Sequence, residues 1–462
     1  MIGIGAAGTV TAAVGIVTGA AGAGAALRAS GRSDLTSQER GTIRRSEHGS
    51  GMRLVSESMP WVRSVSLGVW VTAGSRDEHP RIAGASHFLE HLLFKGTRTK
   101  TAREIAESFD VVGGDLNAFT AKEHTAFYAR VLDRDLPMAV EHLCDMIQHS
   151  LIRASDLDAE RTVILEEINM HEDAPDELVH DLFMEHLWPG HPIGRSVLGT
   201  VETISAMSRD QVRRFWRRHY VPGNFVVAAA GNLDHDHLEE MVSSYMDTTD
   251  PGDPRGTVVP AQGEPPSPTG GAHIRHRQTE QAHICIGTAG LSRNDPRRFA
   301  MGVVNDAIGG GMSSRLFQEI REKRGLVYSV FSYHSMFAQT GAFVIYAGTA
   351  PSRAREVLGL IARELESVAE KGVTEQELDR AKSHMRGSMV LSLEETSARM
   401  SRVAKSEIAH GEVIGLDEVL ERIDAVTADD ARSVAEDVLI RPRALTVVGP
   451  FDDGEFAEFA RQ

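Results

Sequence analysis

Cysteine is nearly absent from this 462-residue chain, which contains only Cys144 and Cys285. Two thiols far apart in the sequence provide neither a disulfide framework nor a cysteine-based metal site, both of which need several cysteines at short spacings. So few cysteines are typical of reducing compartments, where disulfides do not persist. We therefore expect a cytoplasmic protein.

Positive charge is also in short supply. The chain carries 49 lysine and arginine residues against 65 aspartate and glutamate residues, and its formal net charge is −16. Proteins that bind nucleic acids rely on a positively charged surface that displaces counterions from the phosphates. We expect no nucleic-acid partner. Solubility explains the acidic excess, although the excess would also suit basic peptides as substrates.

Strongly apolar residues are sparse at the start of the chain, where residues 1–27 are uncharged and dominated by glycine and alanine. A signal peptide would place Lys or Arg ahead of its apolar stretch, and none precedes this one. A glycine- and alanine-rich run has only a marginal free energy of membrane insertion. We predict a disordered tail over residues 1–40 and no membrane partner, with a membrane anchor as the alternative.

Hydrophobic periodicity divides the rest of the chain into strands and helices. Within residues 53–73, Val65, Leu67, Val69 and Val71 alternate with smaller or polar residues, the pattern of a half-buried strand. Further strands are predicted at 115–120, 125–132 and 225–230, and helices near 82–95, 103–112, 134–149, 155–170, 176–187, 208–219 and from about 235.

Residues 250–271 contain six prolines and five glycines, the composition of an extended linker. Two segments before the linker recur after it: VSLGVWVTAGSRD (65–77) parallels AHICIGTAGLSRND (282–295), and NFVVAAAGNLDHDHL (224–238) parallels ALTVVGPFDDGEF (444–456). Matches near both ends of both halves indicate a duplicated unit. The sequence thus predicts an α+β fold of two homologous domains, 41–249 and 272–462.

Residues 87–91 read HFLEH, an HxxEH motif. On a helix His87 and His91 are four positions apart, so both imidazoles project from one face. Neutral imidazole is a good ligand for Zn²⁺, and Glu90 is placed to take a proton from a water molecule in the same site. This is the inverted form of the HExxH motif. The alternative is a polar face with two unrelated histidines, which a buried helix disfavours because unpartnered polar groups there are costly.

A catalytic zinc needs three protein ligands and one open position. The helix predicted near 155–170 offers Glu160, Glu166 and Glu167 as candidates for the third ligand. Glu160 and Glu167 are two turns apart on one face, but periodicity alone does not decide which of the three reaches the metal. A surface acid without a metal role is the alternative for each.

Four longer motifs extend the pattern: AGASHFLEHLLFKGT (83–97), GGDLNAFTAKEHTAFYARVL (113–132), ERTVILEEI (160–168) and GGGMSSRLFQEIREKRGLVYSV (309–330). With them the chain resembles the pitrilysin/insulinase family of zinc peptidases, the inverzincins, and most closely its mitochondrial-processing-peptidase-like branch. The resemblance covers most of the chain after the tail. It implies two domains, each a mixed and mainly antiparallel sheet packed with helices, that face each other as a clamshell.

The resemblance also implies roles at the metal site. It assigns one zinc ion per chain to a ligand set of His87, His91 and Glu167. Glu90 would be the catalytic base. Glu160 would orient a histidine ligand through a hydrogen bond, which leaves Glu166 without a metal role.

Four further residues match positions that handle the substrate in the family. Asn117 and Ala118 match an edge-strand segment that binds the substrate as an added β-strand through main-chain hydrogen bonds. Arg321 would hold a substrate carbonyl, and Tyr328 would donate a hydrogen bond to the oxyanion as it forms. Apart from the resemblance, Asn117 is equally well explained as a turn residue and Arg321 as an exposed helix charge.

The implied function is that of a zinc metalloendopeptidase, which hydrolyses peptides or unfolded protein segments in an enclosed chamber. The second half has no HxxEH motif of its own and would complete the chamber without catalysing the reaction. The resemblance further implies a homodimer, or a heterodimer with a similar inactive chain. The alternative is a catalytically silent structural or substrate-presenting subunit of a larger complex, which the complete motif set disfavours.

Overall fold

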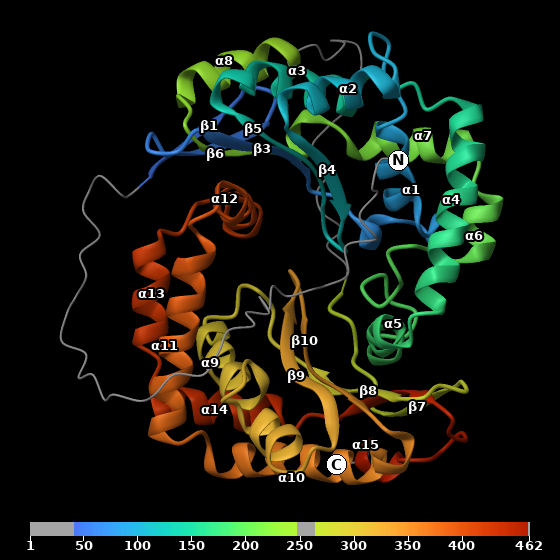
Figure 1. Cartoon of the computed structure of the whole chain (residues 1–462), viewed down its shortest axis with the longest axis vertical. Helices are drawn as coiled ribbons and strands as arrows, with labels where there is room; N and C mark the ends of the chain where they lie inside the picture. Colours follow the sequence, from blue (N-terminus) through green and yellow to red (C-terminus); the bar gives the residue numbers. More distant parts are fainter. Residues whose placement is uncertain (1–40, 247–263, 461–462) are drawn as a thin grey trace.

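The computed structural model describes residues 41–246 and 264–460, which form two sheets with helices packed on them (Figure 1). The predicted tail, residues 1–40, and most of the predicted linker lie outside the described residues. Of the linker, residues 264–270 form neither helix nor strand, and Gly271 already begins a strand. Within the described ranges, no helix combines the length and the apolar character needed to cross a bilayer.

The first half of the chain builds a six-stranded sheet. Its strands are β1 (Thr42–Glu47), β2 (Arg53–Ser58), β3 (Ser64–Val71), β4 (Asp115–Thr120), β5 (Thr125–Leu132) and β6 (Phe225–Gly231). Its helices are α1 (Ala85–Leu93), α2 (Ala102–Val112), α3 (Leu136–His149), α4 (Ala154–Glu172), α5 (Pro175–Leu187), α6 (Val201–Ala206), α7 (Arg209–His219) and α8 (His235–Met246).

The second half builds a five-stranded sheet. Its strands are β7 (Gly271–His276), β8 (Ala282–Ala289), β9 (Val327–Met336), β10 (Gly341–Thr349) and β11 (Ala444–Gly449). Its helices are α9 (Arg298–Gly309), the π-helical segment η5 (Phe317–Glu322), α10 (Ala354–Lys371), α11 (Glu375–Ser392), α12 (Thr396–His410), α13 (Leu416–Asp424), α14 (Ala428–Val438) and α15 (Ala457–Ala460).

The two sheets have the same topology apart from the extra edge strand β1. The strand orders are β1-β2-β6-β3-β5-β4 and β7-β11-β8-β10-β9. Each sheet contains one parallel pair, β2 with β6 and β7 with β11, and is otherwise antiparallel. The segments that matched in sequence occupy equivalent places, since β3 corresponds to β8 and β6 to β11. The predicted pair of homologous α+β units is therefore confirmed.

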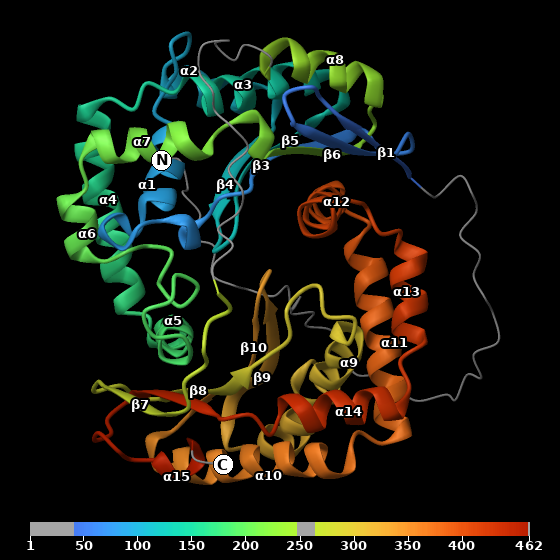
Figure 2. The ribbon, with the colours of Figure 1, turned by 180° about the vertical axis from the view of Figure 1, so that it is seen from behind.

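Helix α5 of the first half packs on the sheet of the second half (Figures 1 and 2). Its apolar residues Val179, Phe183 and Leu187 join a buried cluster with Cys285 of β8 and Val344 of β10. Because burial of apolar surface is the main stabilising contribution in such cores, this helix ties the two halves together.

Helix α12 of the second half packs in return on the sheet of the first half (Figure 2). Met400, Val403 and Ala404 lie against Trp70 of β3 and Val226 of β6. In chain order α5 and α12 are equivalent, each being the third helix after the hairpin of its half. The exchange is therefore reciprocal, and neither sheet buries both faces without the other half.

The exchange corrects the expectation that β3 is half-buried. Val65, Leu67, Val69 and Val71 belong to the core of the first half, as the alternation predicts. Trp70, however, lies on the opposite face and is also fully buried, because α12 covers that face. A covering helix that comes from some 330 residues further along cannot be read from the strand itself.

The tips of two equivalent hairpins meet between the halves, where β4 and the β9–β10 pair point toward each other (Figure 1). Glu123, in the β4–β5 turn, accepts hydrogen bonds from the amide of Ala338 at 3.1 and 3.2 Å, and it pairs with Arg293 at 3.1 Å. Glu123 also pairs with Arg76, which donates to the side chain of Gln339 at 2.8 Å. A largely buried carboxylate side chain thus connects the two halves.

We expect Glu123→Ala to lower the free energy of unfolding by about 3 kcal/mol, because it leaves two largely buried guanidinium groups without their counter-charge. Urea unfolding of the full chain measures the change. The matched control is Glu107→Ala, which removes an exposed carboxylate paired with the exposed Arg103 and should leave stability unchanged. Equal stability of the two variants would contradict the role given to Glu123.

Candidate metal centre

Helix α1 carries the HxxEH motif, and a buried carboxylate caps its N-terminus. Glu78 accepts hydrogen bonds from the amides of Gly84 at 2.7 Å and Ser86 at 2.6 Å. Gly84 has a φ of 91°, and a Cβ there would lie 2.6 Å from the carbonyl oxygen of Leu198. Burial raises the pKa of Glu78 to about 7. The cap satisfies amides that the helix itself leaves unpaired, and so it fixes where α1 begins.

The apolar face of α1 holds the motif inside the first half. Phe88, Leu89, Leu92 and Leu93 are fully buried in its core. The two histidines share the other face, as their spacing predicts, and their ring centroids lie 4.7 Å apart with the planes at 70°. The side chains that could bind a metal are thus carried by a helix that packing holds rigidly.

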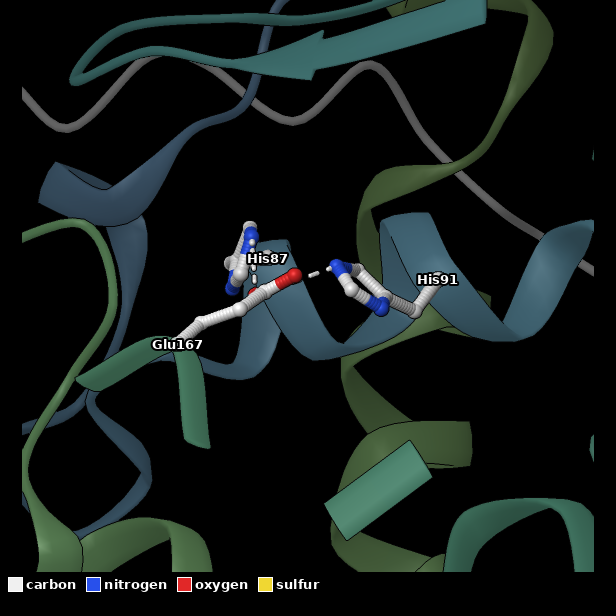
Figure 3. A group of neighbouring side chains, drawn as sticks. All are labelled: His87, His91 and Glu167. Atoms are coloured by element: carbon white, nitrogen blue, oxygen red, sulfur yellow. Dashed lines mark ion pairs between the residues drawn. The ribbon is translucent and has the colours of Figure 1, made fainter. Parts of the chain in front are cut away.

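Helix α4 packs on α1 and brings one carboxylate to the histidines (Figure 3). Glu167 Oε2 lies 3.7 Å from His87 Nε2 and 3.5 Å from His91 Nε2. Glu166, the preceding residue, is exposed. Of the three acidic candidates on this helix, Glu167 is the one that lies between both imidazoles.

Glu160 lies behind His91, two turns earlier on α4. Its Oε2 is 3.0 Å from His91 Nδ1, and its Oε1 is 2.7 Å from Lys95 Nζ. A hydrogen bond from Nδ1–H to this carboxylate leaves Nε2 of His91 with its lone pair toward Glu167. Glu160 therefore contacts the histidine from behind, in the position that the resemblance implies.

The surroundings shift the pKa values of the three candidate ligands in different directions. Burial lowers the pKa of His87 to about 3, so its imidazole is neutral. Burial also opposes charging of His91, but the hydrogen bond to Glu160 and the negative charge of Glu167 raise its pKa overall. Burial raises the pKa of Glu167. A cation placed among these groups would favour the neutral imidazoles and the ionised carboxylate.

The donor set fits a zinc ion. Glu167 Oε2 is buried and has no hydrogen-bond partner in the described part of the chain, an arrangement that is costly for a carboxylate unless a cation is bound. Two imidazole nitrogens and one carboxylate oxygen are a ligand set of catalytic zinc sites. Ligands about 2.1 Å from a tetrahedral ion lie roughly 3.4 Å apart, close to the 3.5 and 3.7 Å observed here.

Glu90 adjoins this centre, and Thr120 at the end of β4 holds it. Thr120 Oγ1 donates a hydrogen bond to Glu90 Oε2 at 2.5 Å. Burial raises the pKa of Glu90, and this hydrogen bond partly opposes the rise. A desolvated carboxylate with a raised pKa is suited to accept and return a proton near neutral pH.

Strand β4 is the outermost strand of the first sheet and pairs with β5 alone in the described part of the chain. The hydrogen bond from Ala121 N to His124 O (2.8 Å) closes the turn and sets the phase of the antiparallel pattern. In that phase Asn117 exchanges backbone hydrogen bonds with Tyr128. The backbone groups that face the open edge belong to the intervening residues Leu116, Ala118 and Thr120.

The side chain of Asn117 reaches the same edge. Its Oδ1 accepts a hydrogen bond from the amide of Ala118 at 2.8 Å. Asn117 is thus an exposed strand residue and not a turn residue. The predicted pair lies where an extended peptide could add to the sheet. The carbonyl of Ala118 faces the open edge, whereas its N–H is bonded to the side chain of Asn117.

Arg321 and Tyr328 lie together in the second half. The Arg321 guanidinium is 4.9 Å from the ring of Phe317 and 5.6 Å from the ring of Tyr328, which is 78% exposed. Among the described residues no hydrogen bond or ion pair joins either of them to the metal centre. Their pairing is observed, whereas their reach to the first half stays a prediction.

Three residues that build the site were missed by the sequence analysis. Glu78 had a signal, because an acidic residue ahead of a helix is a common cap. Lys95 had a weak one, since a cation four residues after His91 lies on the same helix face. Thr120 had none, because it reaches Glu90 from a strand 30 positions later.

Family models match both halves of the chain. The model described as insulinase (peptidase family M16) matches residues 53–201. The model described as the peptidase M16 inactive domain matches residues 206–385. The first match contains the candidate metal centre, and the second contains Arg321 and Tyr328.

Similar proteins match over nearly their whole length. An uncharacterized zinc protease of Streptomyces coelicolor is 50% identical over 422 residues, which are 89% of this chain and 91% of that protein. An uncharacterized zinc protease of Bacillus subtilis is 41% identical over 401 residues, 87% and 97% of the two chains. The structure of a protease from Helicobacter pylori matches with a TM-score of 0.84 at 20% identity, over 89% of this chain and all of that one. At that identity the structural likeness supports the fold.

Proposed function

Because the chain belongs to the insulinase family (peptidase family M16), we propose that it is a zinc-dependent endopeptidase. The observation that supports this most directly is the meeting of His87, His91 and Glu167 beside a desolvated Glu90. Ligands and base come from two helices that the core holds in place. A catalytically silent subunit would not require this cluster of buried ionisable side chains, which is costly to maintain without a metal ion.

The proposed zinc ligands are Nε2 of His87, Nε2 of His91 and Oε2 of Glu167. Glu160 fixes the tautomer of His91 and keeps its ring in place. A bound zinc ion would supply Lewis-acid chemistry, polarising the carbonyl of the scissile peptide bond. Three protein ligands leave room for water and substrate beside them.

Glu90 is the general base of the proposal. It takes the proton of the attacking water molecule and passes it to the leaving amine. Its burial disfavours the charged carboxylate and therefore promotes proton uptake. The hydroxyl of Thr120 keeps one carboxylate oxygen occupied, so the other is free for the proton.

The open edge of β4 would bind the substrate as an added strand. Main-chain groups along this edge, the carbonyl of Ala118 among them, would hold an extended peptide with little regard to its sequence. Arg321 would hold a substrate carbonyl, and Tyr328 would donate to the developing oxyanion from the second half. We propose that the facing halves form a chamber that selects unfolded segments, and that the chain acts as a homodimer or beside a similar inactive chain.

Glu160→Gln should weaken zinc binding about 10- to 100-fold, the usual effect of removing a carboxylate that orients a histidine ligand. Titration of the metal-free protein with zinc against a chromophoric chelator measures the dissociation constant. The control variant Glu166→Gln changes an exposed carboxylate of the same helix, directly before the proposed ligand Glu167. This variant should bind zinc as tightly as the wild type. If Glu166→Gln weakened binding and Glu160→Gln did not, the carboxylate assignment on α4 would be wrong.

Glu90→Gln should retain zinc and cleave an unstructured peptide mixture about 10²- to 10⁴-fold more slowly, because it removes the general base. Wild-type cleavage should stop with a chelator and return with added zinc. Mass spectrometry of the products gives both the rate and the cut sites. Cleavage by Glu90→Gln at the wild-type rate would refute the assignment, and a zinc-loaded wild type without cleavage would favour the silent-subunit alternative.

A further inference from the structure

We propose that Thr120 is a positioning residue for Glu90 and links the substrate-binding edge of β4 to the general base. The inference rests on the proposed peptidase function. Thr120 Oγ1 donates a hydrogen bond of 2.5 Å to Glu90 Oε2. In the described residues, no other group donates a hydrogen bond to this carboxylate.

The position of the Glu90 carboxylate depends on this single donor, because the glutamate side chain has several rotatable bonds and is largely buried. Ordering such a side chain costs conformational entropy. Thr120 is itself 7% exposed and sits in a strand, where a β-branched side chain has few rotamers. The hydroxyl therefore presents a fixed point to which the carboxylate oxygen is bound.

The backbone of Thr120 belongs to the open edge of β4. By the alternation of the ladder, its N–H and C=O face outward together with those of Leu116 and Ala118. Its side chain instead points to the face of the sheet where Leu116 and Ala118 pack against the first-half core and α1. One residue thus touches the strand edge with its main chain and the base with its side chain.

The consequence is a mechanical connection between binding and catalysis. A peptide that adds to the edge would restrain β4 through main-chain hydrogen bonds. The restrained strand carries the hydroxyl that orients Glu90, so the base is best placed when the edge is occupied. Loss of the hydroxyl should reduce turnover while peptide binding at the edge persists.

The same strand pair offers a matched control. Thr125 lies directly opposite Thr120 in β5 and is fully buried, but its hydroxyl donates to the carbonyl of Ala73 at 3.1 Å. Thr120→Val and Thr125→Val make the same change of shape and polarity at neighbouring positions. Only the first removes a contact with Glu90.

The test compares Thr120→Val, Thr120→Ser and Thr125→Val as zinc-loaded full chains on one unstructured peptide. A hydrogen bond to a charged group corresponds to about 10- to 100-fold in rate. We expect Thr120→Val to lose about that factor in kcat with KM and zinc content unchanged. Thr120→Ser should recover most of the loss, and Thr125→Val should keep the wild-type kcat.

A wild-type kcat in Thr120→Val, or an equal loss in Thr125→Val, would overturn the inference. A readout that needs no activity separates it from the proposed function: crystal structures of the zinc-loaded wild type and Thr120→Val. We expect the Glu90 carboxylate to leave its wild-type position in the variant. If it stays, Thr120 does not position it, even should the wild type prove inactive on peptides.

Discussion

The contact between α1 and α4 sets two imidazoles and a carboxylate in the interior of the first half. Polar groups in such surroundings destabilise a fold unless each has a partner. Much of the neighbouring structure supplies those partners. Glu160 accepts from His91, Thr120 donates to Glu90, and Glu78 caps the helix that carries the motif.

Two of the groups among these candidate ligands still lack a hydrogen-bond partner in the described residues, His87 Nδ1 and Glu167 Oε2. Glu167 Oε2 faces both Nε2 atoms and receives no hydrogen bond from the described residues. A cation is the partner that satisfies two neutral nitrogens and an ionised oxygen together. The geometry therefore indicates a metal site independently of any likeness to other proteins. The family membership agrees with this interpretation.

The second half acts on the first through packing rather than through ligands. The exchange of α5 and α12 gives each sheet a cover that its own half lacks. Glu123 adds a polar connection at the hairpin tips, a short distance along the chain from the edge strand β4. The duplicated unit is thus a pair in which one copy carries the candidate metal centre and both copies are needed for a complete core.

The sequence predicted those parts of the fold that depend on local periodicity. Strands β4 and β5 begin and end at the expected residues, and α4 departs from its expected bounds by one or two. Strand β1 was missed because its TIRRSE sequence is mostly exposed and is held by pairing with β2. Helix α6 was missed because six residues are too few to show a helical period.

In the candidate site, too, the features that depend on local periodicity were predicted and those that depend on tertiary packing were not. The spacing of His87 and His91 predicted their common face, because four residues make about one helical turn. The choice of Glu167 over Glu166 depends on the rotation of α4 against α1, which tertiary packing decides. The contact of Thr120 with Glu90 joins a strand to a helix and therefore depends on tertiary packing. The amphipathic pattern of α5 or α12 likewise shows that the helix has an apolar face, but not which of the two sheets that face covers.

The most direct test of this account is anomalous scattering at the zinc absorption edge from crystals of the zinc-loaded protein. We predict one peak per chain, about 2.0–2.2 Å from His87 Nε2, His91 Nε2 and Glu167 Oε2. A fully zinc-loaded protein without a peak between α1 and α4, or with the ion held by other residues, would contradict it.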